Sequence, residues 1–418
     1  MTKTKMPPAF SRLWTAATVS SLGDGAYTAA LPLLALLLDS DPLVVSLVTV
    51  AVLAPYPVAG LFAGALVDRW DRRRTMWLAD LARAVLLAAT VAAGAFGWLS
   101  IPVLFVVAFL LGTGTLFFDT AAQAYLPDLL ARDQTLLRRA NGYLRGASTA
   151  AGQFAGPPVG SFLFTVGRTL PFAVNALTYV ASAVLIRTLP PAPVPERTPG
   201  RSVWADSKEG FAYVVKDRLL LGLALRPAVG NLAFGAFGAV LVVFAKDALG
   251  LDSAGYGFLL AVEAAGGLVG AMVLAGPLEK WLGTGTALTV TAVIEGGAVL
   301  VFGLARDPWL AGAMFALCGC AMATTMVLGG SLRQVVVPAR LMGRVAAASR
   351  LVSASAAPAG AALGGWLAAT AGVRVPYVAA AGVLVSMTLV TMSMTSNKKI
   401  EEALARAKDS FTVRSGAD

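Results

Sequence analysis

GALVDRWDRRR, residues 64–74, separates two long apolar runs, VVSLVTVAVLAPYPVAGLFA before it and LARAVLLAATVAAGAFGWL after it. Six of its eleven residues are charged, while the runs beside it have one charge between them. A helix of about 20 apolar residues crosses a ~30 Å hydrocarbon layer. The stretch therefore predicts a polar turn between two membrane-spanning helices.

The rest of the chain repeats this pattern. Of its 418 residues, 57% are hydrophobic and 13% are charged, whereas a soluble domain has about a quarter of its residues charged. The apolar runs are continuous rather than alternating, which predicts an all-α integral membrane protein and excludes a barrel. We expect twelve spans, at residues 13–38, 43–67, 75–98, 101–126, 142–166, 170–188, 219–245, 254–276, 283–304, 308–332, 343–369 and 373–395.

The basic residues lie mostly on one side of these spans. With the N-terminus inside, only Arg168, Lys246, Arg306 and Arg374 of the 33 Lys and Arg fall outside, which leaves 29 on the inner side or in its adjoining helix ends. This asymmetry predicts a cytoplasmic membrane protein with both termini in the cytoplasm. It also accounts for the net charge of +10 without a nucleic-acid partner.

The chain reads as two related halves. We expect a six-helix bundle at 1–188, a cytoplasmic linker with a surface helix at 189–218, a second six-helix bundle at 219–395 and a cytoplasmic tail at 396–418. A pair of glycines four residues apart, followed by charge, occurs in the second span and again in the eighth. Matching features of the two halves are about 205–211 residues apart, which is typical of transporter repeats.

The opening stretch has the order G-x-x-x-D-R-x-x-R-R-R, in which Asp71 stands where a second glycine is usual. With FSRLWTAATVSSLGDG and LPDLL…RRANG, it resembles the major facilitator superfamily, in a drug–proton antiporter-like branch with macrolide and siderophore exporters. The resemblance implies two six-helix bundles related by a pseudo-two-fold axis. The residues that match the family's loop signature are Gly64, Asp68, Arg69, Arg73 and Arg74.

Two interpretations of this gating loop remain open. Asp68 could cap the positive N-terminus of a helix from the other half, so that the loop acts as a latch between the bundles. Alternatively, the loop is only a basic turn that fixes the topology. The spacing of Asp68 after Gly64 favours the latch, because the positive-inside rule does not require an acidic residue there.

The fifth span contains AGQFAGPPVGS, residues 151–161. Its Gly152, Gly156, Pro157 and Gly160 resemble the fifth-helix signature of drug–proton antiporters, which is associated with export. Glycine lets helices approach closely, and proline bends a helix. A packing kink with no further role is the alternative.

Ionisable residues inside spans are functional candidates because they are costly to place in lipid. Asp24, between Gly23 and Gly25 near the middle of the first span, is the leading candidate to bind a proton or a cationic substrate. A structural hydrogen bond between helices is the other interpretation. Asp119 and Glu263 are secondary candidates, and we expect Arg145 to pair with a carboxylate.

Other residues predict where a substrate could bind and what is absent. The family's central cavity could be lined by Tyr27, Phe154, Asn231 and Phe234. We expect no cofactor and no metal site, since the chain has no histidine, no nucleotide-binding loop and only Cys318 and Cys320, two residues apart. The expected partners are a small-molecule substrate, protons and membrane lipid, and we expect a monomer.

Together these features predict a secondary transporter, not an enzyme. We expect it to export an amphipathic small molecule, such as an antibiotic, drug or siderophore, by proton antiport with alternating access. An importer or a lysophospholipid flippase on the same scaffold remains possible, as does a membrane receptor that transports nothing.

Overall fold

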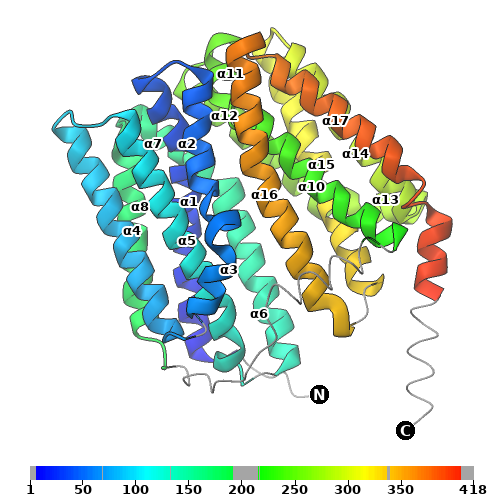
Figure 1. Cartoon of the computed structure of the whole chain (residues 1–418), viewed down its shortest axis with the longest axis horizontal. Coiled ribbons are helices and arrows are strands. Elements are labelled where there is room, and N and C mark those ends of the chain that lie inside the picture. The colour runs from blue at the N-terminus through cyan, green and yellow to red at the C-terminus, as the bar shows by residue number, and fades with distance from the viewer. Residues whose placement is uncertain are drawn as a thin grey trace. The chain divides into compact units, whose positions relative to one another are not determined.

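The computed structural model describes residues 6–67, 69–131, 133–191, 215, 217–336 and 339–405, which form helices joined by short turns (Figure 1). These residues fall into two compact units. The N-terminal unit lies within Met1–Thr198 and Ala245–Ala261, and the C-terminal unit lies within Pro199–Phe244 and Val262–Asp418. Most of the linker expected at 189–218, including residues 192–214, lies outside the described residues.

The helices of each unit follow one another along the chain. The N-terminal unit is built mainly from α1 (Pro8–Leu38), α2 (Pro42–Leu53), α3 (Pro55–Val67), α4 (Arg72–Ala95), α5 (Ile101–Leu129), α6 (Gln134–Ala147), the π-helix η1 (Ser148–Ala155), α7 (Gly156–Val166) and α8 (Leu170–Arg187). The C-terminal unit is built mainly from α10 (Arg218–Gly238), most of α12 (Ser253–Val269), the π-helix η2 (Gly270–Leu274), α13 (Ala275–Leu282), α14 (Thr284–Leu304), α15 (Pro308–Val336), α16 (Ala339–Ala371) and α17 (Val375–Met392). The division between the units crosses α11 (Leu241–Asp247) and α12.

The all-α membrane architecture predicted from the sequence is confirmed. Ten described helices are long and apolar enough to cross a membrane. The two remaining expected spans, 142–166 and 343–369, fall on the α6–η1–α7 rod and on α16. All twelve expected ranges therefore lie on helices.

Aspartate side chains begin many of these helices. An aspartate oxygen at a helix start accepts a backbone N–H that has no partner within the helix, which typically stabilises it by ~1 kcal/mol. Asp71 does this for α4, where it accepts from the Arg74 amide at 2.8 Å. The same bond is made by Asp41 at α2, Asp133 at α6, Asp217 at α10, Asp252 at α12 and Asp307 at α15.

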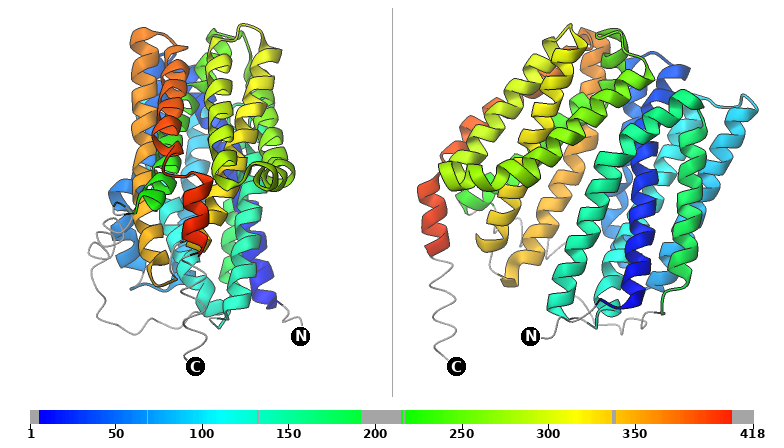
Figure 2. Two further views of the ribbon diagram at one scale, coloured as in Figure 1. Left: turned by 90° about the vertical axis from the view of Figure 1, so that its right-hand side faces the viewer. Right: turned by 180° about the vertical axis from the view of Figure 1, so that it is seen from behind.

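In the N-terminal unit, α1 lies between the α6–α7 rod and α8 (Figure 2, right). Small residues allow this close approach. A Cβ atom at Gly156 would lie 2.6 Å from the Cα of Gly25, and one at Gly160 would lie 2.5 Å from the Cα of Ala26. The glycines of the fifth-span motif therefore pack α7 directly against α1, beside Asp24.

The C-terminal unit is joined to its own tail by a polar contact. Residues 397–405 are helical, and Ile400 is buried in a cluster with residues of α10, α13, α14 and α15. The Asn397 Oδ1 atom accepts the backbone N–H groups of Gly285 at 2.7 Å and Thr286 at 3.2 Å. Asn397 thus caps the first turn of α14 from more than 100 residues away in sequence.

Candidate functional site

Asp24 lies on α1 at the edge of a buried cluster of charged side chains. Its own side chain is 35% exposed within the unit, while Gly23 and Gly25 on either side are buried. The Tyr179 hydroxyl of α8 donates a short hydrogen bond to its Oδ1 atom. Asp24 is therefore both anchored to α8 and open to the surface of the N-terminal unit.

Arg83 of α4 is the only cation at the centre of the cluster, as far as the described residues show. Its side chain is 1% exposed and forms an ion pair with Asp80, one turn earlier on α4. Its Nη1 atom donates to the Thr115 hydroxyl of α5 at 3.2 Å and lies 4.0 Å from the Asp24 carboxylate. Arg83 thus has one close carboxylate partner and one more distant one.

Two aromatic rings hold the Arg83 guanidinium in place. Its Cζ atom lies 4.1 Å from the ring centre of Tyr179 and 4.9 Å from that of Phe118. A cation over an aromatic face is stabilised by ~2 kcal/mol when it is desolvated. Tyr179 contacts Arg83 through its ring and Asp24 through its hydroxyl, so it links the two charges.

A third carboxylate lies close to this group. Asp119 of α5 accepts a hydrogen bond from the Tyr56 hydroxyl of α3 at 3.4 Å and interacts electrostatically with Arg83. We call Asp24, Asp80, Arg83 and Asp119 the N-terminal charge cluster. It contains three carboxylates and one guanidinium, so it has two more acids than bases.

Two of these residues were predicted from the sequence and two were missed. Asp24 and Asp119 were candidates, and the structure brings both close to one arginine. Arg83 was counted only among the basic residues of the inner side, and Asp80 was not considered. Their spacing was the available signal, because opposite charges three residues apart inside an apolar run lie on one helix face and can pair.

No carboxylate partner of Arg145 is found among the described residues. Arg145 lies on α6 with an exposed side chain, and the described residues include no carboxylate in ion-pair contact with it. The arginine that does meet Asp24 comes from α4. Arg145 is instead placed on the exposed face of α6.

The other predicted carboxylate, Glu263, lies in the C-terminal unit. It is partly buried where α12 crosses α15, and a Cβ atom on Gly319 would lie 3.1 Å from its Cγ atom. Within the described residues its carboxylate has no hydrogen bond or ion pair. Asn231, which was predicted to line the cavity, lies on α10 of the same unit.

Two partly buried arginines in the C-terminal unit donate hydrogen bonds to neutral oxygens instead. Arg226 of α10 donates to the Leu288 carbonyl at 2.6 Å and to the hydroxyls of Thr391 and Thr395 at 3.0 and 3.3 Å. Pro227 follows it and has no N–H for the Leu223 carbonyl, four residues back in the helix. Arg333 of α15 donates to that carbonyl at 3.0 Å, which satisfies it.

The predicted cavity residues are divided between the units. Tyr27 is buried and packs edge-on against Phe172, with ring centres 5.9 Å apart. Phe154 lies on η1 and is partly buried. Phe234, on α10 of the C-terminal unit, is exposed and packs against Phe237. Tyr27 is therefore a packing residue in the N-terminal unit as described.

The gating loop makes contacts within its own unit. Asp68 lies outside the described residues, so the predicted latch contact is not described. Arg72 forms an ion pair with Asp128 at the end of α5, and Arg73 donates to the Leu189 carbonyl after α8 at 2.6 Å. Gly64 lies on α3, and Arg69 is exposed. The loop thus ties the start of α4 to the ends of α5 and α8.

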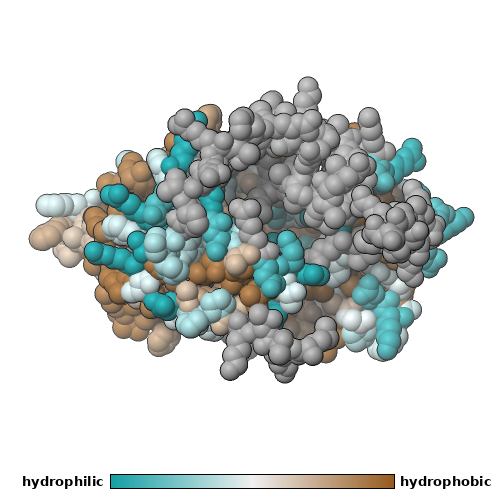
Figure 3. All heavy atoms as spheres, turned by 90° about the horizontal axis from the view of Figure 1, so that it is seen from below, coloured by the Kyte–Doolittle hydropathy of each residue, from teal (hydrophilic) through white to brown (hydrophobic). Residues whose placement is uncertain are grey.

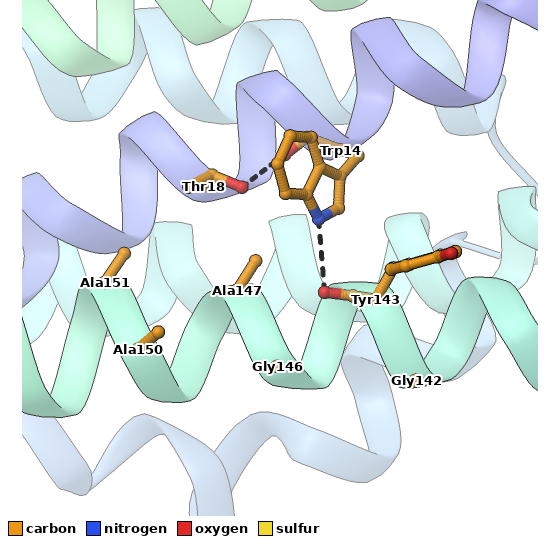
Figure 4. Close-up of a pocket in the computed structure, with 8 residues that line it drawn as sticks. All are labelled: Trp14, Thr18, Gly142, Tyr143, Gly146, Ala147, Ala150 and Ala151. Atoms are coloured by element: carbon orange, nitrogen blue, oxygen red, sulfur yellow. Dashed lines mark hydrogen bonds between the residues drawn. The ribbon is translucent and has the colours of Figure 1, made fainter.

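An open groove of about 340 Å³ lies between α1 and the α6–η1 rod (Figure 4). The Trp14 indole N–H donates to the Tyr143 carbonyl at 3.2 Å across it. Most of the residues that line it on α6 and η1 are glycine or alanine, so its lining is largely apolar. Its lining consists of Trp14, Thr18, Gly142, Tyr143, Gly146, Ala147, Ala150 and Ala151.

Residues 13–361 match the family described as the Major Facilitator Superfamily. The chain belongs to this family. As a major facilitator it is a multi-pass membrane transporter of small molecules and not an enzyme, as the sequence predicted.

Curated relatives include exporters. The multidrug efflux pump Tap of Mycolicibacterium fortuitum is 29% identical over 389 residues, covering 91% of this chain and 93% of Tap. The enterobactin exporter EntS of Escherichia coli O1:K1 is 26% identical over 355 residues, covering 82% and 80%. These relatives confirm the resemblance to the exporter branch of the superfamily.

Solved structures show the same fold at low sequence identity. A bacterial homologue of the iron transporter ferroportin, in its inward-facing state, matches with a TM-score of 0.73 at 15% identity, over 93% of this chain and 98% of that one. The nucleoside transporter NupG matches with a TM-score of 0.73 at 14% identity, over 92% and 99%. Both confirm the major facilitator fold.

Proposed function

We propose that this transporter exports an amphipathic small molecule in exchange for protons, and that Asp24 is the coupling carboxylate. The observation that carries the proposal is the charge count of the N-terminal charge cluster. Three carboxylates share one guanidinium in a site where two of the groups, Asp80 and Arg83, are 0% and 1% exposed.

Charge that is buried without a partner is strongly unfavourable, so the surplus acids need a cation. Arg83 forms a close ion pair with Asp80, and the rings of Phe118 and Tyr179 pack against its guanidinium. Asp24 is 4.0 Å from the same guanidinium and is the exposed member of the two. A proton or a cationic substrate arriving from the open side therefore meets Asp24 first.

The groups around Asp24 come from every helix near it. They comprise Tyr27 on its own helix, Asp80 and Arg83 on α4, Asp119 on α5, Tyr56 on α3, and Asn175 and Tyr179 on α8, while η1 and α7 contribute backbone and glycine. When Asp24 is ionised, Arg83 and Tyr179 stabilise it. When Asp24 binds a proton, Arg83 remains paired with Asp80, and the cluster loses one negative charge.

This change can bias a conformational equilibrium, which is what coupling requires. A ligand shifts an equilibrium only by its difference in affinity between two states. α1 and α8 are linked by the Asp24–Tyr179 bond, and α4 and α8 by Arg83 over Tyr179. Protonation of Asp24 weakens the electrostatic attraction between α1 and α4, so it favours states in which α1 moves relative to α4.

For the substrate we propose contact with the groove at Trp14 and Tyr143. Exposed aromatic side chains beside a lining of glycine and alanine suit a flat apolar group. The export direction is supported by the efflux relatives Tap and EntS and by the fifth-span motif, whose glycines pack against α1.

The test uses purified protein in vesicles with an imposed pH gradient, with ethidium as the first probe substrate. We expect Asp24→Asn to lose gradient-driven transport while still binding ethidium, and Asp39→Asn, at the end of the same helix, to transport normally. Coupled transport by Asp24→Asn equal to wild type would contradict the assignment. Flux in the inward direction would favour an importer or flippase, and binding without flux would favour a receptor.

The remaining parts of the proposal concern topology and assembly. We propose that both termini are cytoplasmic, that the protein acts in the cytoplasmic membrane as a monomer, and that Asp68 in the gating loop latches the bundles. The sidedness of Lys and Arg supports the topology. Loss of transport with normal insertion in Asp68→Asn would support the latch.

A further inference from the structure

The neighbouring helices α4 and α8 expose matching apolar stripes. The two helices pack against each other, and each exposes three large aliphatic side chains at positions i, i+3 and i+7. The exposed fractions range from 41% to 69%. The stripes consist of Leu78, Leu81 and Val85 on α4 and Leu177, Val180 and Val184 on α8. In a membrane protein such a surface faces lipid tails.

Each stripe ends in an arginine at the same end of the helix pair. Arg74 lies one turn before Leu78, and Arg187 lies one turn after Val184. The helices are antiparallel here, since Arg73 at the start of α4 bonds the Leu189 carbonyl just after α8. Figure 3 shows this end of the molecule, where hydrophilic side chains gather beside hydrophobic ones.

Trp77 brings the two arginines toward one place. The Arg187 guanidinium lies over the Trp77 ring at 5.8 Å. Arg74 is three residues before Trp77, so both lie on the same face of α4. Tryptophan is favoured where membrane tails meet the polar headgroups. The pair therefore lies at the depth of a lipid headgroup.

Neither guanidinium has an acidic partner in the part of the chain that the structure describes. Other arginines nearby are occupied: Arg72 pairs with Asp128, and Arg73 bonds the Leu189 carbonyl. Asp71, the nearest acid along α4, accepts the Arg74 backbone amide to cap the helix. Two arginine side chains are thus left facing outward beside an apolar surface.

We propose that this site binds one anionic phospholipid of the cytoplasmic leaflet. Its phosphate contacts Arg74 and Arg187, and its tails lie along the stripes of α4 and α8. Arginine binds phosphate through paired N–H groups. The apolar stripes favour a lipid over free phosphate, because only a lipid covers them while its phosphate reaches the arginines.

The site also has a consequence for the N-terminal charge cluster. α4 carries Arg83, and α8 carries Tyr179, whose ring lies 4.1 Å from that guanidinium. A headgroup held by both helices fixes their ends relative to each other. An anionic lipid therefore stabilises the contact between Arg83 and Tyr179 from outside the cluster. This proposal does not depend on which substrate is transported.

The experiment measures lipid retention by native mass spectrometry on the full chain. Protein is exchanged into detergent with equal amounts of phosphatidylglycerol and phosphatidylcholine. We expect wild type to retain one phosphatidylglycerol preferentially, and the double variant Arg74→Gln/Arg187→Gln to retain it about thirty-fold less, which corresponds to about 1 kcal/mol for each of the two arginines near the surface. The matched control is Arg168→Gln, an exposed arginine at the opposite end of α8, which should retain lipid normally.

Two results would overturn the proposal. One is equal phosphatidylglycerol retention by wild type and the double variant. The other is displacement of the lipid by millimolar inorganic phosphate, which would make the site a free-phosphate site. If the double variant does not fold, Trp77→Leu replaces it, because it removes the ring under Arg187 without changing the charge and is also expected to lower retention.

Discussion

The arginines inside the spans of the two units have different hydrogen-bond and ion-pair partners. In the N-terminal unit, Arg83 is surrounded by carboxylates and aromatic rings. In the C-terminal unit, Arg226 and Arg333 donate to backbone carbonyls and threonine hydroxyls. A charge held by other charges depends on the protonation of its partners, whereas a charge held by neutral oxygens does not. The comparison supports the proposal that protons are coupled in the first unit.

The largest loss of stability is expected from breaking the ion pair between Arg83 and Asp80. Arg83→Leu leaves Asp80 buried with no cation, and removing one partner of a buried pair is destabilising by ~3–5 kcal/mol. We expect a strongly lowered thermal unfolding temperature in detergent and poor expression.

The control for this variant is the double change Asp80→Asn/Arg83→Leu. It removes both charges, so it should recover much of the lost stability while transport stays impaired. A single Arg83→Leu variant as stable as wild type would mean that the pair is not as isolated from water as its exposure indicates.

A smaller loss of stability is expected from replacing Arg226, whose hydrogen bonds go to neutral oxygens. Arg226→Met removes the same charge from the second unit, but its threonine partners keep bonds to carbonyls of their own helices. Among the hydrogen-bond partners of Arg226, only the Leu288 carbonyl loses its strongest donor, and Glu295 loses an electrostatic interaction with the guanidinium. We therefore expect a loss of ~1–2 kcal/mol. Measuring the thermal unfolding of Arg226→Met and Arg83→Leu in parallel tests this order of effects. Equal losses in the two variants would remove the distinction between the units.

The smallest effect on stability is expected at Glu263. Glu263→Gln keeps the shape of a side chain that has no ion pair among the described residues, so we expect the free energy of unfolding to change by less than ~0.5 kcal/mol. Transport at several pH values tells whether this acid also carries protons. A large loss of stability would reveal a partner for the carboxylate, and the two units would then be more alike.

The spans were predictable because lipid imposes a simple length and composition rule. The candidate site was less predictable from the sequence. Asp24 was visible from the sequence because it interrupts an apolar helix between two glycines. Asp80 and Arg83 were not assigned, since Arg83 was counted only with the basic residues of the inner side and the pairing of the two charges was not considered. Tyr179 was missed because a tyrosine in a span is ordinarily a packing residue.

Other features depend on contacts that sequence spacing does not contain. The glycines at 152, 156 and 160 predicted a close helix contact, but not that α1 beside Asp24 would be the partner. The π-helices η1 and η2 follow no sequence rule that we could apply. The cap on α14 was also not predicted, because Asn397 is distant in sequence and its segment was expected to be a tail.

That cap has a consequence for the order in which the protein forms. The first turn of α14 receives its side-chain acceptor from Asn397, which is 112 residues after Gly285 in the chain. At a synthesis rate of ~5–20 residues per second, the acceptor emerges roughly 6–20 s later. During that interval the first turn of α14 lacks this acceptor, so the C-terminal unit gains its cap only after residues 397–405 have been synthesised.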